Sequence, residues 1–116
     1  MKVPAIRFRA AGGPEVIELG ETEVRDPGPG EVQIEVAAAG VNRADVLQRK
    51  GFYPAPPGAP PDVPGLELSG TVVARGPGAT QWEIGAAVMA IVSGGAMARR
   101  TWRRTCARWR CAGGWC

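Results

Sequence analysis

Three cysteines near the end of the sequence are the side chains whose type best suits metal binding or nucleophilic chemistry. Cys106, Cys111 and Cys116 follow one another with a C-x4-C-x4-C spacing. A structural zinc site usually needs four thiolate or imidazole ligands, and this sequence has 3 Cys and no His. The absence of histidine also excludes an imidazole base. We therefore predict no metal site, and we expect free thiols, as is usual for a cytosolic protein.

The same end of the sequence combines arginine with tryptophan. Residues 96–116 contain six arginines and no acidic residue, whereas residues 1–95 contain 8 Lys and Arg against 11 Asp and Glu. Six arginines beside Trp102, Trp109 and Trp115 could contact phosphates while the rings stack on bases. No nucleic-acid-binding motif accompanies them, so we do not expect nucleic acid to be the partner. The formal net charge of +3 is therefore positive only because of this tail.

Glycine clusters are the other candidates for chemistry, because a glycine-rich turn before a helix can hold a dinucleotide. That site needs a strand, a G-x-G-x-x-G turn and a helix. Residues 76–81 lack the third glycine and a following helix, and Gly94-Gly95 is followed by no such pattern. We therefore expect that residues 1–116 alone do not hold a dinucleotide in a productive position.

Short apolar stretches separated by glycine and proline predict that the part before residue 95 is rich in β-strands. Val32, Ile34 and Val36 share one face of the clearest strand, and Ile6 and Phe8 share one face of an earlier strand. Strand character is found in residues 3–9, 16–24, 31–36, 68–74 and 88–92. The predicted fold is mainly β, a small and partly open β-barrel with one short helix and an irregular C-terminal tail.

The predicted helix covers residues 42–50. Asn42 is a favoured N-cap, Asp45 lies in the first turn where the helix dipole favours a negative charge, and Gly51 ends the helix. The side chains expected to face inward are Val46 and Leu47. Six of the next thirteen residues are proline, which predicts an extended loop over residues 52–64.

The length of 116 residues allows one domain. No segment approaches the roughly 20 apolar residues that span a bilayer, and the first residues contain no apolar stretch typical of a secretion signal. We therefore expect no membrane contact and a cytoplasmic location.

Six short motifs follow one another in an order that is more specific than any one of them. They are GGPEV (12–16), PGPGEV (27–32), AAGVNRAD (38–45), QRKGFYP (48–54), PGLELSG (64–70) and GPG (76–78). In this order, residues 1–95 resemble the N-terminal GroES-like domain of the medium-chain dehydrogenase/reductase superfamily. Within that superfamily they are most similar to the zinc-free quinone oxidoreductases.

The resemblance implies a reaction and a set of site residues. Zinc-dependent relatives have a cysteine near the helix start and a Gly-His-Glu motif, whereas this sequence has Asn42 and Gly65-Leu66-Glu67. The implied activity of the intact enzyme is hydride transfer from NADPH to a quinone-like acceptor without zinc. The catalytic residues implied by position are Tyr53, Asn42 and Asp45, and Asn42 and Tyr53 would also contact the cofactor.

Structural interpretations of two of these residues remain open beside the catalytic one. Asn42 is by default a helix N-cap, and Asp45 could serve the helix dipole and an ion pair with Arg49. Tyr53 is the sole tyrosine and is therefore the strongest candidate for a functional role.

The composition break at residue 95 suggests two parts with different histories. We interpret residues 1–95 as a truncated GroES-like catalytic domain, and residues 96–116 as a frameshifted, disordered tail. Reading the coding sequence one base earlier is consistent with a Gly-Tyr-Gly…Tyr-Val pattern like that of the family. The alternative is a stand-alone GroES-like binding module whose basic tail contacts nucleic acid or another partner. The oligomeric state is left open.

Overall fold

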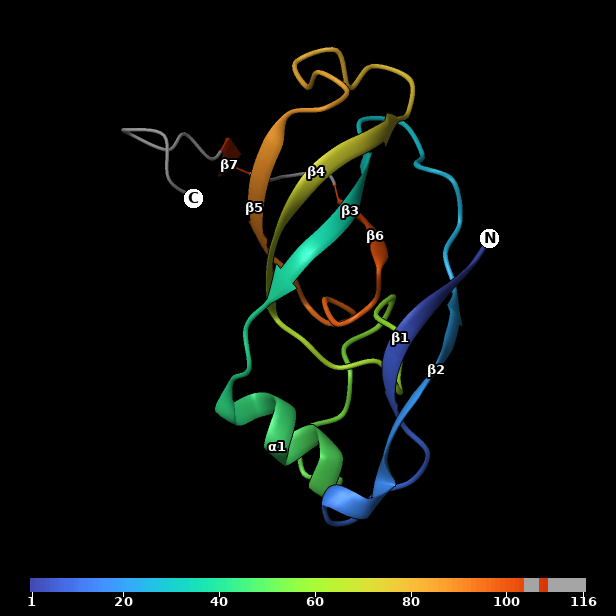
Figure 1. The fold of residues 1–116 in the computed structure, drawn as a ribbon, viewed down its shortest axis with the longest axis vertical. Coiled ribbons are helices and arrows are strands. Elements are labelled where there is room, and N and C mark those ends of the chain that lie inside the picture. The colour runs from blue at the N-terminus through green and yellow to red at the C-terminus, as the bar shows by residue number, and fades with distance from the viewer. Residues whose placement is uncertain (104–106, 109–116) are drawn as a thin grey trace.

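Two antiparallel sheets and one short α-helix make up the protein in the computed structural model, which describes residues 1–103 and 107–108 (Figure 1). The smaller sheet pairs β1 (Lys2–Phe8) with β2 (Ile17–Glu23), and the 3-10 helix Pro14–Val16 lies between them in sequence. The larger sheet has the strand order β6-β3-β4-β5-β7. Its strands are β3 (Val32–Ala39), β4 (Glu67–Arg75), β5 (Ala87–Ile91), β6 (Arg100–Arg103) and β7 (Ala107–Arg108).

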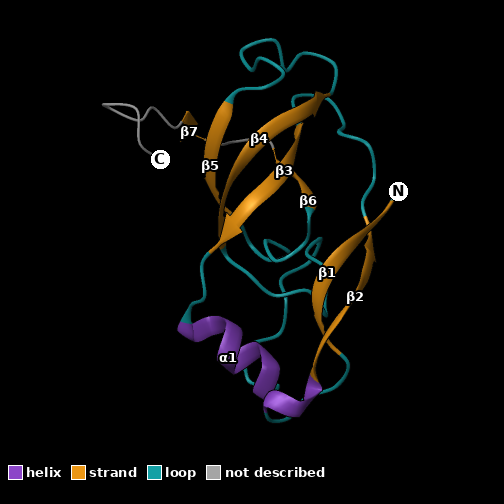
Figure 2. Ribbon diagram, viewed as in Figure 1, coloured by secondary structure: helices purple, strands orange, loops and turns teal. Residues whose placement is uncertain are grey.

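These elements confirm the predicted mainly β fold with one short helix, α1 (Arg43–Lys50) (Figure 2). Within the described residues, the two sheets are connected by one isolated bridge, between Ala5 and Ala98, so the barrel is open. The proline-rich segment 52–64 is a loop without helix or strand, as expected. None of the helices in this part of the chain is long and apolar enough to cross a membrane.

The main core lies in the larger sheet. Val32 and Ile34 of β3 are fully buried, and they pack in one cluster with Val72 of β4 and Val88 of β5. The face that alternation assigned to apolar residues is therefore the core face, as predicted. Gln33, on the opposite face, is only 3% exposed, and its Nε2 donates to the carbonyl of Arg25 at 3.4 Å. The start of β3 is therefore buried on both faces, whereas Ala37 and Ala38 near its end are exposed.

The first part of the C-terminal segment differs from the expected irregular tail. Ala96 is fully buried in the main core, and Arg100–Arg103 pair with β3. The N–H of Ala96 donates to the carbonyl of Gly65 at 3.2 Å, and the N–H of Val36 donates to the carbonyl of Arg99 at 2.8 Å. Backbone pairing with the edge of β3 requires no particular side chain, so an arginine-rich sequence can form it.

The rest of that segment falls largely outside the described residues. Ala107–Arg108 form β7, which pairs with β5 at Val88 and Met89. The predictions for Cys106, Cys111 and Cys116, and for Trp109 and Trp115, concern residues that the structure does not describe.

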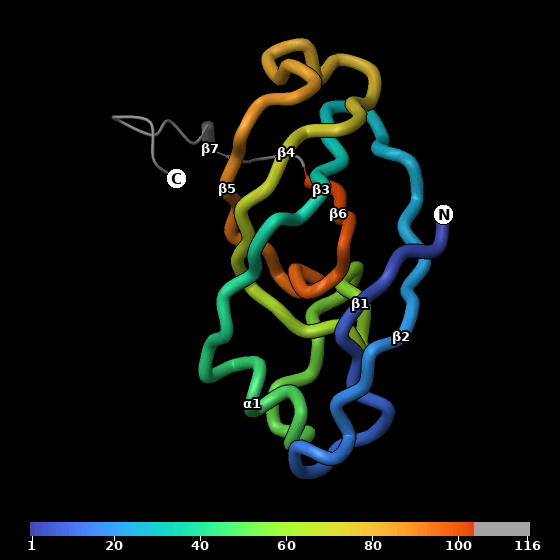
Figure 3. The backbone as a smooth tube through the Cα atoms, in the orientation of Figure 1, coloured from blue at the N-terminus to red at the C-terminus, as the bar shows by residue number. Residues whose placement is uncertain are grey.

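The helix α1 lies at the end of the molecule where β3 finishes and where the β1–β2 connection turns (Figure 3). Its last turn is held there by two contacts with Gly12. The N–H of Gly12 donates to the carbonyl of Arg49 at 2.9 Å, and Arg49 Nε donates to the carbonyl of Gly12 at 3.1 Å. Gly51 follows with φ 86°, the left-handed conformation expected of a C-terminal glycine. These contacts tie the helix to the connection between β1 and β2.

Candidate functional site

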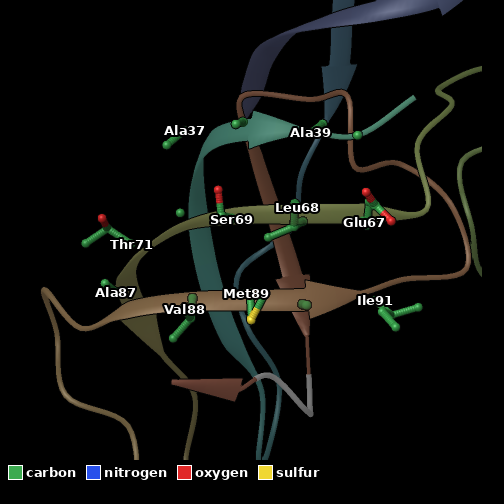
Figure 4. A pocket seen from close by; sticks show the side chains of 14 residues that line it. Ala37, Ala39, Glu67, Leu68, Ser69, Thr71, Ala87, Val88, Met89 and Ile91 are labelled. Carbon is green, nitrogen blue, oxygen red and sulfur yellow. The ribbon is translucent and has the colours of Figure 1, made fainter. Parts of the chain in front are cut away.

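A groove of about 920 Å³ runs over the outer face of β3, β4 and β5 (Figure 4). Alternate residues of β4 point toward it and give it its polar atoms, whereas β5 contributes the exposed apolar side chains. The close-up labels Glu67, Ser69 and Thr71 on β4, and Met89 and Ile91 on β5. Hydroxyl and carboxylate groups beside an apolar surface suit a ligand with an apolar body and a few polar atoms.

One end of the groove leads into the start of α1. Gly40 lines the groove, and its N–H donates to the carbonyl of Glu67 at 3.3 Å. The Glu67 side chain lies so close to Gly40 that a Cβ at this position would clash with it. Asn42 follows two residues later as the N-cap of α1. Its side-chain Nδ2 is buried and has no hydrogen-bond partner among the described residues.

Asp45 is the most completely engaged of the predicted site residues. It is 4% exposed, and its Oδ2 accepts a hydrogen bond from the N–H of Asn42 at 2.8 Å. Its Oδ1 accepts another from the N–H of Gly65, 2.9 Å away. Each carboxylate oxygen therefore holds a backbone amide, one before the helix and one in the turn before β4. Arg49 points to Gly12 instead, so the expected Asp45–Arg49 ion pair is absent from the described contacts.

The buried face of α1 also differs from expectation. Val46 and Leu47 were expected to face inward, but both are half-buried, and Asp45 is the buried residue of the helix. The reason is the hydrogen bond between Asp45 and Gly65. The helix turns this carboxylate toward backbone N–H groups, and its apolar side chains remain half-buried. A buried carboxylate with two amide donors is well accommodated, because hydrogen bonding offsets the cost of burial.

Tyr53 lies beyond the opposite end of the helix. It follows the C-terminal Gly51 by two residues and is 37% exposed. Eight helical residues separate it from Asn42, which corresponds to about 12 Å of helix length. The structure therefore brings Asn42 and Asp45 together and places Tyr53 apart from them. Its phenol remains open to solvent in this loop.

The acidic residues near the site do not form a metal-ligand cluster. Among the described residues, no three His, Cys, Asp or Glu side chains gather in a way that could hold a metal ion. Glu67, the residue left from the Gly-His-Glu position, is exposed and packs over Gly40.

A second cavity, of about 410 Å³, lies between β2, β6 and the loops around Pro60 and Gly94. Sequence reasoning did not predict it. Arg25 reaches Glu31 through two hydrogen bonds of 2.7 and 3.1 Å, and its guanidinium carbon lies 3.9 Å from the centre of the Trp102 ring. The hydrogen-bonded Glu31 carboxylate raises the pKa of Arg25. Arg103 lies on the same wall, and no local sequence pattern links these distant residues.

Comparison with known proteins supplies the family. The alcohol dehydrogenase GroES-like domain family matches residues 28–116. A quinone oxidoreductase of Pseudomonas aeruginosa is 42% identical over 80 residues, which make up 69% of this chain and 24% of that protein. The chain therefore spans about a quarter of the length of this relative.

Solved structures agree with the sequence match. Escherichia coli quinone oxidoreductase complexed with NADPH has a TM-score of 0.80 and 32% identity, covering 92% of this chain and 33% of that one. The human synaptic vesicle membrane protein VAT-1 homolog-like protein has a TM-score of 0.83 and 34% identity, covering 93% and 35%. The chain thus belongs to the alcohol dehydrogenase GroES-like domain family, within the medium-chain dehydrogenase/reductase superfamily.

Proposed function

We propose that this chain is the N-terminal part of an NADPH-dependent quinone oxidoreductase, which transfers a hydride from NADPH to a quinone-like acceptor. The observation that carries the proposal is the 42% identity to the Pseudomonas aeruginosa quinone oxidoreductase over 80 residues, 69% of this chain.

Two side chains of this chain fit the acceptor side of such a reaction. Asn42 has an amide Nδ2 without a hydrogen-bond partner in the described part of the chain, and Tyr53 is 37% exposed. NADPH supplies the hydride when it is bound. A hydrogen-bond donor near the acceptor oxygen stabilises the negative charge that develops there. We assign this role to Tyr53, and we assign the orientation of the nicotinamide ring to Asn42.

Asp45 has a different role in this proposal. Because its two oxygens already accept backbone N–H groups, it is a positioning residue that fixes Asn42 relative to Gly65. The remainder of NADPH needs a glycine-rich turn at a helix N-terminus, and the sequence contains no G-x-G-x-x-G pattern. The pyrophosphate therefore has to be held by a further domain.

We propose that the reaction uses no zinc. The support is the chemistry of the donor set: the sequence has no histidine, and the helix start carries Asn42 where a thiolate ligand would be needed. A cytoplasmic location remains a prediction.

The expected truncation at residue 95 can be tested together with the activity. We propose that a one-base shift after codon 95 separates this reading frame from that of a longer enzyme. Sequencing the gene on both strands, followed by expression of both reading frames, provides the two proteins. We expect NADPH oxidation with benzoquinone from the longer protein and none from residues 1–116. Turnover by the 116-residue chain contradicts the truncation, and an inactive, folded longer protein contradicts the proposed activity.

Variants of the longer protein test the residue roles. We expect Tyr53→Phe to lower kcat by about 10- to 100-fold, because the variant loses a donor to the developing charge. Asn42→Ala is expected to raise the KM for NADPH. The matched control is Arg43→Gln, a change at an exposed residue of the same helix, which should leave both constants within about twofold.

The alternative function, a binding module with a nucleic-acid-binding tail, is not favoured by the contacts of the described tail residues. Arg99 Nε pairs with Glu35 at 3.3 Å, and Trp102 is covered by Arg25. These side chains are engaged within the domain and do not present an aromatic surface for base stacking. Fluorescence anisotropy with a labelled oligonucleotide checks this, and we expect no saturable binding at about 150 mM salt.

A further inference from the structure

The second cavity is a pocket with an excess of positive charge. Its volume of about 410 Å³ is within the range of small-molecule sites, roughly 300–1,000 Å³. Three arginines line it, against a single carboxylate, that of Glu23. Glu23 is already paired with the N-terminal ammonium of Met1 at 2.6 Å. The pocket therefore has more cationic groups than its own acidic residue can neutralise.

The three arginines differ in what they contact. Arg25 is neutralised by Glu31, as described above. Arg100 has only a weak contact of 3.6 Å from its Nη1 to the sulfur of Met1. Arg103 donates from Nη2 to the carbonyl of Gly94 at 2.8 Å, and no carboxylate in residues 1–103 or 107–108 lies within ion-pair distance of it. Two cationic side chains thus remain without an anionic partner in the described structure.

Arg103 is the more informative of the two because it is half-buried. Its Nε is buried and has no hydrogen-bond partner among the described residues. Burial lowers the pKa of its guanidinium, and the charge of Glu31 opposes this effect. A buried cationic donor without a partner is costly, and an unsatisfied group of this kind in a native fold calls for a bound ion or water.

Much of the remaining wall of the cavity is apolar. Pro60, Ala59, Ala98 and Val24 line it together with Trp102, whose ring is 5.7 Å from the guanidinium carbon of Arg103. An inorganic anion would use the arginines and leave this apolar surface uncovered. A ligand that combines one anionic group with a flat apolar body would use both parts.

We propose that this cavity binds a small organic carboxylate, with its anionic group on Arg103 and Arg100 and its apolar body against Ala59 and Pro60. The site lies on the side of β6 and β2, whereas the groove over β3, β4 and β5 lies on another face and shares no lining residue with it. The inference therefore stands independently of the proposed quinone reduction. Under this proposal, β6 contributes residues to a binding site in addition to pairing with β3.

Isothermal titration of the 116-residue chain with benzoate tests the proposal. Benzamide has the same ring without the charge, and acetate has the charge without the ring, so both serve as matched controls. We expect benzoate to bind at least about tenfold more tightly than either, because each lacks one of the two complementary parts. Affinity should also fall as salt increases. Equal binding of benzoate and benzamide, or no binding of benzoate, would overturn the proposal.

Substitutions locate the site. Arg103→Gln should weaken benzoate about 10- to 100-fold, as expected for the loss of a charged hydrogen bond. Arg100→Gln, which changes a more loosely held side chain, provides a second variant if Arg103→Gln fails to fold. Arg99→Gln is the matched control, because Arg99 lies in the same segment but pairs with Glu35 and does not line the cavity. An effect of Arg99→Gln equal to that of the other two would contradict the assigned site.

Discussion

The start of α1 and the strand β6 each remove polar atoms of a charged side chain from solvent, but the hydrogen bonding of those atoms differs. At the helix, Asp45 has a backbone amide on each carboxylate oxygen. At β6, Arg103 has one backbone carbonyl and a buried Nε with no partner in the described residues. A charge whose hydrogen bonds are all made within the chain stabilises the fold. A charged group that still has an N–H without an acceptor can donate that hydrogen bond to a ligand.

The largest expected effect is at Asp45. We expect Asp45→Ala to lower the free energy of unfolding by about 3–5 kcal/mol, because two buried N–H groups lose a charged acceptor. Denaturant unfolding measures the change. Asp26→Ala, at an exposed carboxylate, is the control and should cost less than about 0.5 kcal/mol. A small loss at Asp45 would mean that the helix start does not depend on its carboxylate.

Substitution of Arg103 should change the free energy of unfolding much less than substitution of Asp45. Arg103→Met replaces the half-buried cation by an apolar chain of similar length, which removes a desolvation cost together with the hydrogen bond to Gly94. We expect the free energy of unfolding to change by no more than about 1 kcal/mol. A loss as large as that at Asp45 would show that the guanidinium is fully paired, and the contrast between the two regions would fail.

The smallest expected effect concerns acid stability at the rim of the second cavity. The hydrogen bond from the N-terminal ammonium lowers the pKa of Glu23. Stability from this pair is therefore present above the ordinary carboxyl pKa and is lost as pH falls through the lowered value. Glu23→Gln should flatten the decrease of the thermal midpoint on the acid side. Glu21→Gln, at an exposed residue of the same strand, should leave that decrease unchanged.

Local patterns predicted much of the fold and part of the site. The alternation that includes Val32 and Ile34 located the core face of β3, and the cap residues located α1. The Asn42–Asp45 contact is local too. By contrast, the second bond of Asp45 reaches Gly65, twenty residues away, and no periodicity reports such a contact.

Two other differences have the same physical origin. In β1 the shared face was assigned to Ile6 and Phe8, but Val3 and Ala5 are the buried residues. The strand packs against Val63 and Ala98, where small side chains fit, and neither neighbour could be inferred from local sequence. The strand β6 could not be predicted for the same reason. Composition describes side chains, whereas β6 is held on β3 by backbone hydrogen bonds.

The segment around Ala98 has a practical consequence for shortening the protein. The N–H of Ile6 donates to the carbonyl of Met97, and the N–H of Arg99 donates to the carbonyl of Pro4, with the Ala5–Ala98 bridge between them. A protein that ends at residue 95, where the composition changes, would lose these contacts of β1. The hairpin of β1 and β2 would then be free to detach or to pair with another copy. A usable shortened version has to extend through Arg103, eight residues beyond the point that composition marks.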